Sequence, residues 1–348
     1  MPIPCVMSSA TVNRGGTGRA VLVGFLVLVG LGIVGFGAWF VLGSGAGPDE
    51  ASASDAKPAE SSASAIEAAL AAARTYSGNK EFGKASAILR AAVEEHADDQ
   101  ALRLAYAEAL LAQQETAKAY EQYEAALAIG PQDASIELAA GTLATQIGKD
   151  DRALEHFSMA RTADPGSAEI ARYLGVTQQR LGQTGDAKAN LLAALELDET
   201  DGVAPAALAQ IALDENQLSL AGRYIARARK ADPEQLAYRI LEARILNRRG
   251  KPEQAVTLLK ALPEDQFYQP MVLDLMSASY GFLRQPEAAA AMYVAASERE
   301  PAVAEFPFQA ALWFERSGDL ESAARFANQA AMLGHAQGRA LVDRLSGG

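Results

Sequence analysis

The 348-residue sequence contains one cysteine and three histidines, and aromatic side chains make up only 7% of it. A single cysteine cannot close a disulfide within the chain, and it excludes a cysteine-rich zinc site. The scarcity of aromatic side chains disfavours a fold rich in β-strands. Basic residues are outnumbered by acidic ones, 31 to 43, and the net charge of −12 argues against a nucleic-acid partner.

Alanine supplies much of the hydrophobic content instead, with 74 of the 348 residues. Such small side chains favour helices and let neighbouring helices approach each other closely. The composition therefore predicts an all-helical protein whose interior is filled by helix packing.

Residues 20–42 form a long hydrophobic run without a charge, and they include five glycines. At about 1.5 Å per residue they span roughly 35 Å as a helix, enough for a hydrocarbon core of about 30 Å. Arg14 and Arg19 precede the run, whereas acidic residues dominate after it. The positive-inside rule therefore predicts a transmembrane signal anchor, with residues 1–19 in the cytosol and everything after residue 42 exported.

A cleavable signal peptide is the alternative, because Ser44, Gly45 and Ala46 resemble a cleavage site. The apolar cores of such peptides have about 7 to 15 residues, so the longer run favours the anchor. Residues 43–65 follow and are rich in Ala, Ser and Pro. Since they lack a large apolar side chain up to residue 64, they predict a flexible linker.

A period of 34 residues organises the rest of the chain. Four prolines are spaced by multiples of 34 and define position 32 of a repeating unit: Pro131, Pro165, Pro233 and Pro301. Position 20 of the same frame is alanine in all eight units: Ala85, Ala119, Ala153, Ala187, Ala221, Ala255, Ala289 and Ala323. Position 8 is always Ala, Gly or Ser, and position 27 is Ala in seven units. Small residues at these positions let the helices of one unit and of the next pack closely.

Turn-forming residues fall between the expected helices. Gly148, Gly182, Gly250 and Gly318 occupy position 15, where a helix must end in a left-handed residue. Proline at position 32 prevents the second helix of a unit from continuing. Each unit is thus predicted to be a pair of helices.

The pattern of small, Ala, large, Ala and Pro at positions 8, 20, 24, 27 and 32 resembles that of tetratricopeptide-repeat (TPR) proteins over eight units, residues 66–337. The resemblance implies an all-α fold, a right-handed TPR helical solenoid, which would follow the one N-terminal transmembrane helix predicted from the hydrophobic run. The tryptophan that the family carries at position 4 is absent, and Pro263 and Phe267 predict a bend in the second helix of the sixth unit. Residues 338–348 carry apolar side chains on one helical face and predict a C-terminal capping helix.

No group of residues in the sequence points to catalysis. His96, His156 and His335 have no second histidine or cysteine at ligand spacing, and they are interpreted as solvated surface residues. We find no phosphate-binding loop, catalytic triad or pair of carboxylates that the repeats would bring together. The sequence therefore predicts that the protein is not an enzyme and has no metal, cofactor or small-molecule substrate.

The TPR resemblance implies a concave groove lined by positions 2, 5, 9, 12 and 13 of the first helices. In the middle units these positions are polar and locally basic, and they form the predicted protein-binding site: Thr142, Gln146, Arg172, Gln179, Arg180, Gln210, Arg244, Asn247 and Arg248. The four arginines are predicted to donate paired hydrogen bonds to carboxylates of a partner. An acidic glycan is the alternative ligand, with Tyr173 as its one aromatic platform near the groove centre. Apolar residues are expected at both ends of the groove: Leu104, Leu111 and Leu138 at one, and Met271, Phe282, Phe308 and Leu312 at the other.

These features predict a TPR scaffold or adaptor tethered to the bacterial inner membrane, with its N-terminus in the cytosol and its repeats in the periplasm. Its partners would be proteins or peptides of the cell envelope, and its role the assembly, secretion or biogenesis of an envelope complex. Two alternatives stay open. One is an accessory or localising subunit of an envelope enzyme complex such as a polysaccharide synthase, and the other, with reversed topology, is a cytosol-facing adaptor.

Overall fold

The computed structural model of the protein describes residues 56–131 and 133–347. The cytosolic tail predicted for residues 1–19 and the membrane helix predicted for residues 20–42 lie outside this part, as does the first half of the predicted linker. Among the described residues, no helix is both long enough and apolar enough to span a bilayer.

The described residues form eighteen α-helices and no β-strand, which confirms the all-helical prediction. The helices follow one another in this order: α1 (Ala56–Gly78), α2 (Phe82–Glu95), α3 (Gln100–Ala112), α4 (Thr116–Ile129), α5 (Ala134–Gln146), α6 (Asp150–Ala163), α7 (Ala168–Arg180), α8 (Thr184–Leu197), α9 (Val203–Asp214), α10 (Leu218–Ala231), α11 (Leu236–Arg248), α12 (Pro252–Lys260), α13 (Glu264–Phe267), α14 (Pro270–Phe282), α15 (Pro286–Arg299), α16 (Glu305–Ser317), α17 (Leu320–Met332) and α18 (Gly338–Ser346).

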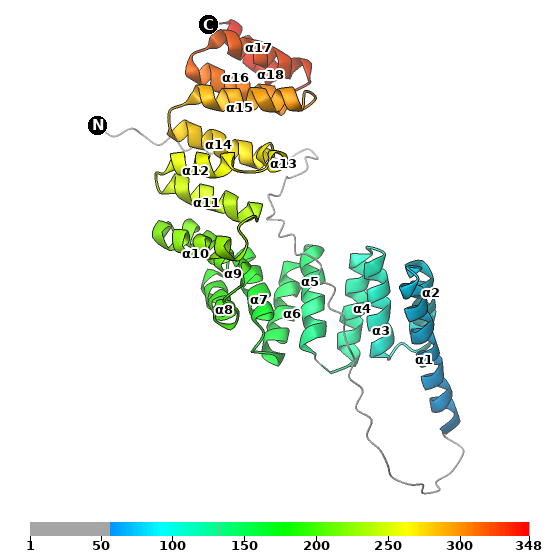
Figure 1. Ribbon diagram of the computed structural model, residues 1–348. Coiled ribbons are helices and arrows are strands. Elements are labelled where there is room, and N and C mark those ends of the chain that lie inside the picture. Colours follow the sequence, from blue (N-terminus) through cyan, green and yellow to red (C-terminus); the bar gives the residue numbers. More distant parts are fainter. Residues whose placement is uncertain (1–55, 132, 348) are drawn as a thin grey trace. The chain divides into compact units, whose positions relative to one another are not determined.

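The helices form consecutive pairs that coincide with the 34-residue units (Figure 1). Each unit has a first and a second helix, from α1 with α2 to α16 with α17, and the sixth unit adds the short α13. The two helices of each pair pack against each other, and the first helices α7, α9, α11 and α14 also touch in succession. The described part of the chain is therefore a helical solenoid in which each unit contacts its neighbours.

The period of 34 residues is the period of close helix contact. The alanine at position 20 is completely buried in all eight units, at 0% exposure. Glycine at position 8 brings the helices closer still in two units. A Cβ on Gly141 would lie 2.6 Å from the Phe157 ring, and one on Gly175 would lie 2.7 Å from Leu191. Small residues thus set the distance between the helices, and the residue at position 24 fills the space beside them.

Position 15 takes the left-handed conformation in all eight units, as its glycines predicted. Four units use glycine, for example Gly182 with a φ of 76°. The other four use residues with a Cβ, whose φ angles lie between 55° and 63°: Lys80, Gln114, Asn216 and Arg284. The left-handed conformation of these four turns could not be predicted from the residue types. The packing of the two helices imposes a conformation that these residues do not favour.

The linker prediction is wrong for its second half, because α1 begins at Ala56 and not after residue 65. We expected a linker because residues 43–64 have no large apolar side chain to bury. Alanine, however, has the highest helix propensity, and the proline of this segment falls in the first turn, where a helix tolerates it. The resulting helix has 23 residues, whereas every other helix of the described part has at most 14.

The sixth unit departs from the others where the sequence places Pro263. Its second helix, α12, ends at Lys260 after nine residues, and the four-residue α13 follows. Proline has no N–H to donate to the preceding turn, which explains the break. Leu262 at position 27 is still buried, with 7% exposure, and α12 packs against α14. The predicted bend is therefore a short interruption that leaves the stacking intact.

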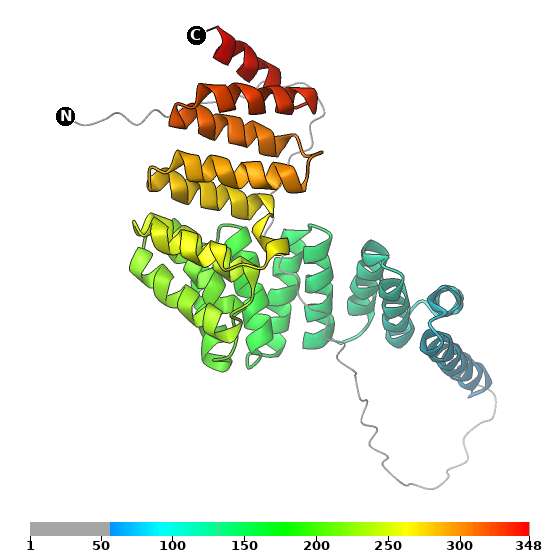
Figure 2. The ribbon, with the colours of Figure 1, turned by 45° about the horizontal axis from the view of Figure 1, so that its top comes forward.

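The last helix, α18, covers the end of the eighth unit. It packs against α17 at the C-terminal end of the chain, as Figure 2 shows, and buries Leu341 to 4% exposure. Gly338 permits this approach, because a Cβ there would lie 2.8 Å from the backbone nitrogen of Ala331.

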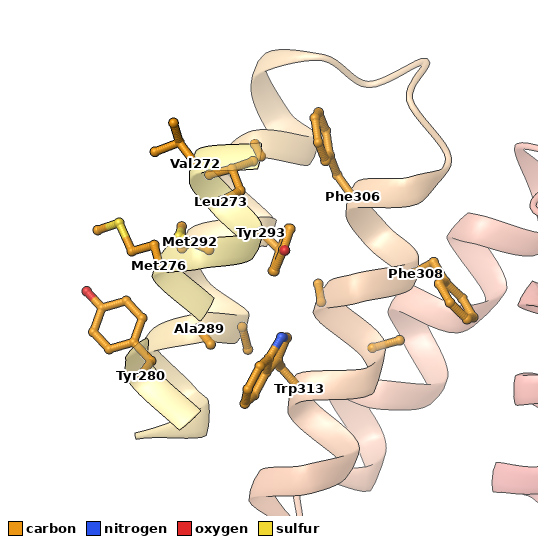
Figure 3. Close-up of a cluster of buried hydrophobic side chains, with 14 of the residues drawn as sticks. Val272, Leu273, Met276, Tyr280, Ala289, Met292, Tyr293, Phe306, Phe308 and Trp313 are labelled. Carbon is orange, nitrogen blue, oxygen red and sulfur yellow. The ribbon is translucent and has the colours of Figure 1, made fainter. Parts of the chain in front are cut away.

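A hydrophobic cluster runs through the last units, from α11 to α18. Figure 3 shows its part around α14, α15 and α16, including Met276, Tyr293 and Trp313. The Tyr293 hydroxyl donates a hydrogen bond to Asp274 at 2.7 Å, and burial raises the pKa of this phenol. The C-terminal units are thus packed around aromatic side chains, although such residues are rare in the sequence.

Candidate functional site

The nine residues of the predicted protein-binding site all lie on first helices of consecutive units. These helices are α5, α7, α9 and α11, and the nine side chains are half-buried or exposed: Thr142, Gln146, Arg172, Gln179, Arg180, Gln210, Arg244, Asn247 and Arg248. We call the side of the first helices that carries positions 2, 5, 9, 12 and 13 the first-helix face. These positions recur at helical spacing, so each helix presents them together.

Two of the four arginines already have carboxylate partners within the chain. Arg180 contacts Asp150 of the preceding unit at 2.8 Å. Arg172, whose side chain is 17% exposed, lies 3.8 Å from Asp201, the last residue of its own unit. The Asp201 carboxylate also accepts hydrogen bonds from the backbone N–H groups of Val203 and Ala204 at the start of α9 in the next unit. Their charges are compensated, so these two arginines tie neighbouring units together and offer less to a partner than predicted.

Tyr173 does not provide the stacking platform that an acidic glycan would need. The ring of Phe157 stacks on it, with ring centres 5.3 Å apart and an interplanar angle of 15°. The guanidinium of Arg172 also lies over the Tyr173 ring, 4.5 Å from its centre. Because contacts within the chain take up this ring, the glycan alternative loses the one aromatic residue that favoured it.

Arg244 and Arg248 differ from the other two arginines, because their hydrogen-bond partners are neutral amides. Arg244 donates to the Gln210 side-chain oxygen at 2.9 Å, and Arg248 donates to that of Asn216 at 3.1 Å. Neither forms an ion pair within the described part of the chain, and Gln210 itself donates to Asp214 at 2.7 Å. The two arginines are four residues apart on α11, so they share one side of the helix.

The amide and hydroxyl side chains of the predicted site also join parts of the chain. Asn247 donates to the Ser279 hydroxyl at 2.8 Å, while its own carbonyl oxygen is buried without a partner among the described residues. The Gln179 amide reaches the backbone carbonyl of Ala207 at 3.5 Å, and Thr142 bonds within its own helix. The first-helix face therefore combines contacts between units with a few donors and acceptors that remain available.

A pocket that the sequence did not predict lies between α14 and α16. Small, aromatic and cationic side chains line it: Ser277, Ala278, Gly281, Phe282, Trp313 and Arg316. Phe282 is 64% exposed although it is aromatic. Trp313 stands at position 10, which belongs to the buried side of the repeat, so the periodic pattern gave no reason to place it beside the first-helix face.

Phe308 was predicted to lie at an apolar end of the groove, and this prediction is wrong. This residue is buried, with 7% exposure, and its ring stacks on His335 with ring centres 3.8 Å apart. His335 lies 3.0 Å from Glu305 and is only 15% exposed, so it is not a solvated histidine. The turn between α17 and α18 covers this end of the unit, whereas Met271 and Phe282 remain exposed as predicted.

Comparisons with known proteins agree with the repeat pattern. The family described as "Tetratricopeptide repeat" matches residues 76–147, and the family described as "Psidin, N-terminal TPR repeats region" matches residues 211–330. The chain is a tetratricopeptide-repeat protein. No curated protein matches its sequence significantly.

Solved structures share the fold of this TPR protein. A tetratricopeptide repeat protein from Parabacteroides merdae has 17% identity and a TM-score of 0.55, over 68% of this chain and 93% of that one. PilW, described as a widely conserved type IV pilus biogenesis factor, has 21% identity and a TM-score of 0.50, over 61% and 98%. Pseudomonas aeruginosa pilF has 17% identity and a TM-score of 0.51, over 63% and 99%.

In this TPR protein, a buried polar cluster joins the second and third units. His156 is 4% exposed, so its interpretation as a solvated residue is wrong. Its Nδ1 lies 2.7 Å from Glu137 and its Nε2 lies 3.2 Å from Glu124. Glu137 stands at position 4, where the family has tryptophan, and it is only 2% exposed. The carboxylate at this position gives the histidine a buried partner that the histidine spacing could not reveal.

Glu124 is the centre of this cluster. Arg152 donates to both of its oxygens, at 2.7 and 2.8 Å, and Tyr120 donates its hydroxyl to the same carboxylate. Although burial alone would raise it, hydrogen bonds from Tyr120, Arg152 and His156 lower the pKa of Glu124 to about 2. No group of three or more His, Cys, Asp or Glu in the described residues has the arrangement of a metal site. We therefore interpret the cluster as a structural tie between units.

This tie predicts a loss of stability in acid. A carboxylate with a depressed pKa stabilises the folded state above its unfolded pKa of about 4.5, and this contribution disappears as the pH falls towards 2. We expect Glu124→Gln to lower the free energy of unfolding by about 1–3 kcal/mol at pH 7 and by roughly half of that or less near pH 3. Urea unfolding followed by circular dichroism at both pH values measures this, with Glu121→Gln on the exposed side of α4 as the control. Equal effects of the two variants at pH 7 would contradict the structural tie.

Proposed function

We propose that this TPR protein is a membrane-tethered scaffold of the bacterial cell envelope that binds a protein or peptide partner on its first-helix face. Its role would be the assembly, secretion or biogenesis of an envelope complex, without enzymatic activity of its own. The pair Arg244 and Arg248 carries the proposal, because these side chains hold cationic donors on α11 that no carboxylate of the described chain compensates.

The amide partners of these arginines suit them to recognition. Gln210 and Asn216 hold the guanidinium groups in place, so an incoming carboxylate would meet donors that are already oriented. A hydrogen bond between two charged groups is stronger than one between a charged group and a neutral amide. Exchange of the amide for a partner's carboxylate is therefore favourable, whereas Arg172 and Arg180 would first have to give up Asp201 and Asp150.

A structural relative supports the envelope role. PilW is described as a type IV pilus biogenesis factor, and this chain shares its fold. A scaffold that serves the assembly of a surface structure fits a repeat array with a binding face on its first helices.

The membrane tether rests on the sequence of the N-terminal region. Residues 20–42 are uncharged and long enough to cross a bilayer, and Arg14 and Arg19 precede them. The repeats would then lie in the periplasm, connected to the membrane by the segment before Ala56.

Topology reporters test the tether. Alkaline phosphatase, which is active only after export, is fused after residue 42 and, in a second fusion, after the last residue. We expect both fusions to be active in membranes, because the positive-inside bias exports everything after the hydrophobic run. A matched reporter that matures only in the cytosol should be silent in both places. Activity of the cytosolic reporter with silent phosphatase would show the reverse topology and overturn the periplasmic role.

Removal of the two uncompensated arginines tests the binding face. We expect Arg244→Gln with Arg248→Gln to lower recovery of the crosslinked partner from native membranes at least about tenfold, because two charge-assisted hydrogen bonds are lost. Helicity and thermal melting should change little, since neither residue belongs to a hydrophobic cluster of the described chain. The control is Arg223→Gln with Lys230→Gln, two exposed cations on the second helix α10 that give the same change in net charge. Equal recovery with the α11 and α10 variants would refute the proposed face.

A further inference from the structure

The pocket between α14 and α16 leaves an apolar surface open at the C-terminal end of the first-helix face. Phe282 is 64% exposed and Met271 on the same helix is 51% exposed, although the described chain buries most of its large apolar residues. Small residues create the recess beside Phe282, because Ala278 and Gly281 stand where larger side chains would fill it.

The Trp313 side chain, which is 9% exposed, lines the pocket from α16. Figure 3 shows Trp313 extending from α16 towards α14 and α15. A Cβ on Gly281 would lie 3.2 Å from this ring, so glycine is what lets the tryptophan approach α14. Two aromatic side chains with small residues between them form a recess suited to an apolar side chain.

One cationic side chain, Arg316, lines this recess, and others are near it in the repeat register. The Arg316 guanidinium lies over the Trp313 ring, 4.6 Å from its centre, and is exposed. Arg248, Phe282 and Arg316 occupy position 13 of the sixth, seventh and eighth units, so an exposed aromatic residue stands between two arginines in the repeat register. Neither Arg316 nor Arg284, which follows Phe282 by two residues, forms an ion pair within the described part of the chain.

The carboxylates of the same helices do not compensate these cations. On α16, Glu315 pairs with Arg344 of α18 at 2.5 Å, and Glu305 lies 3.0 Å from His335. Asp274 on α14 accepts the Tyr293 hydroxyl and lies two turns of helix before Phe282. The region around the pocket is therefore locally basic in a protein whose net charge is −12.

We infer that this surface, made by Phe282, Trp313 and Arg316 with Arg248 and Arg284 beside it, binds a partner segment in which acidic residues flank an exposed apolar side chain. The apolar side chain enters the recess between Phe282 and Trp313, and the carboxylates meet the arginines on either side. This inference rests on the proposed function, because it places the partner's recognition element on the first-helix face.

The segment of this chain that precedes the first unit does not provide this element. Residues 43–64 contain several acidic residues, but no large apolar side chain that could enter the recess. The occupant is therefore a segment of another protein, in which an apolar residue lies within an acidic sequence.

Labelled peptides test the inference directly. The full-length chain in mild detergent is titrated with the fluorescent peptide Glu-Glu-Gly-Gly-Phe-Gly-Gly-Glu-Glu, and anisotropy gives the dissociation constant. We expect replacement of the central Phe by Ala, or of the four Glu by Lys, to weaken binding at least about fivefold. Phe282→Ala and Arg316→Gln in the protein should each weaken binding of the parent peptide by a similar factor. The first removes the apolar contact with the peptide's Phe, and the second removes a hydrogen-bond donor to its carboxylates.

Two matched variants serve as controls. Leu192→Ala removes an apolar side chain on α8 that is 41% exposed, and Arg325→Gln removes an arginine on α17 that lies over the Phe326 ring at 4.7 Å, as Arg316 lies over Trp313. Both should bind the peptide like the wild type, and all four variants should melt at the same temperature within about 2 °C.

Two results would overturn the inference. One is binding of the peptide that Phe282→Ala and Arg316→Gln leave unchanged, and the other is the absence of binding by the wild type at millimolar peptide. If either occurs while partner recovery from membranes still depends on Arg244 and Arg248, only the inference about the pocket is wrong. If recovery is also independent of these arginines, the proposed function is wrong as well.

Discussion

The structure depends on the close approach of helices at completely buried alanines. Position 20 is alanine at 0% exposure in all eight units, and glycines such as Gly141 and Gly175 bring the helices closer in two of them. Because close contact is required once in every unit, the same residue must recur every 34 positions. When the units stack, one side of each first helix does not pack into the core. Polar, cationic and exposed aromatic residues accumulate on this side.

Polar residues of the array divide into those that join units and those that remain available. Arg180 with Asp150 and the cluster around Glu124 connect successive units, so their charges are used within the chain. Arg244 and Arg248 are held by amides, and Arg316 rests on an aromatic ring. On the first-helix face, the compensated arginines therefore lie in the fourth unit, and the arginines without a carboxylate partner lie in the sixth and eighth units. This distribution, more than net charge, locates the proposed binding surface.

Most of the fold could be predicted from the sequence, because the same requirement, a small residue where two helices pack closely, recurs in all eight units. The sequence also placed all nine predicted site residues on first helices, since helical register follows from the period. It could not show that Arg172 and Arg180 are neutralised, because their partners lie about 30 residues away and the distance depends on how units stack. Two further predictions failed for related reasons. Alanine propensity extended α1 into the predicted linker, and the partners of His156 come from two other helices.

The most direct test of this account is the cost of a larger side chain at position 20. Ala221→Leu places three additional carbon atoms where two helices meet, whereas Ala226→Leu makes the same change at an exposed site on the same helix, α10. Chemical unfolding of both variants, followed by circular dichroism, measures the difference. The account predicts that Ala221→Leu lowers the free energy of unfolding by about 2–3 kcal/mol or more, while Ala226→Leu changes it by less than about 0.5 kcal/mol. Equal stability of the two variants would contradict the claim that close approach at the buried alanines holds the units together.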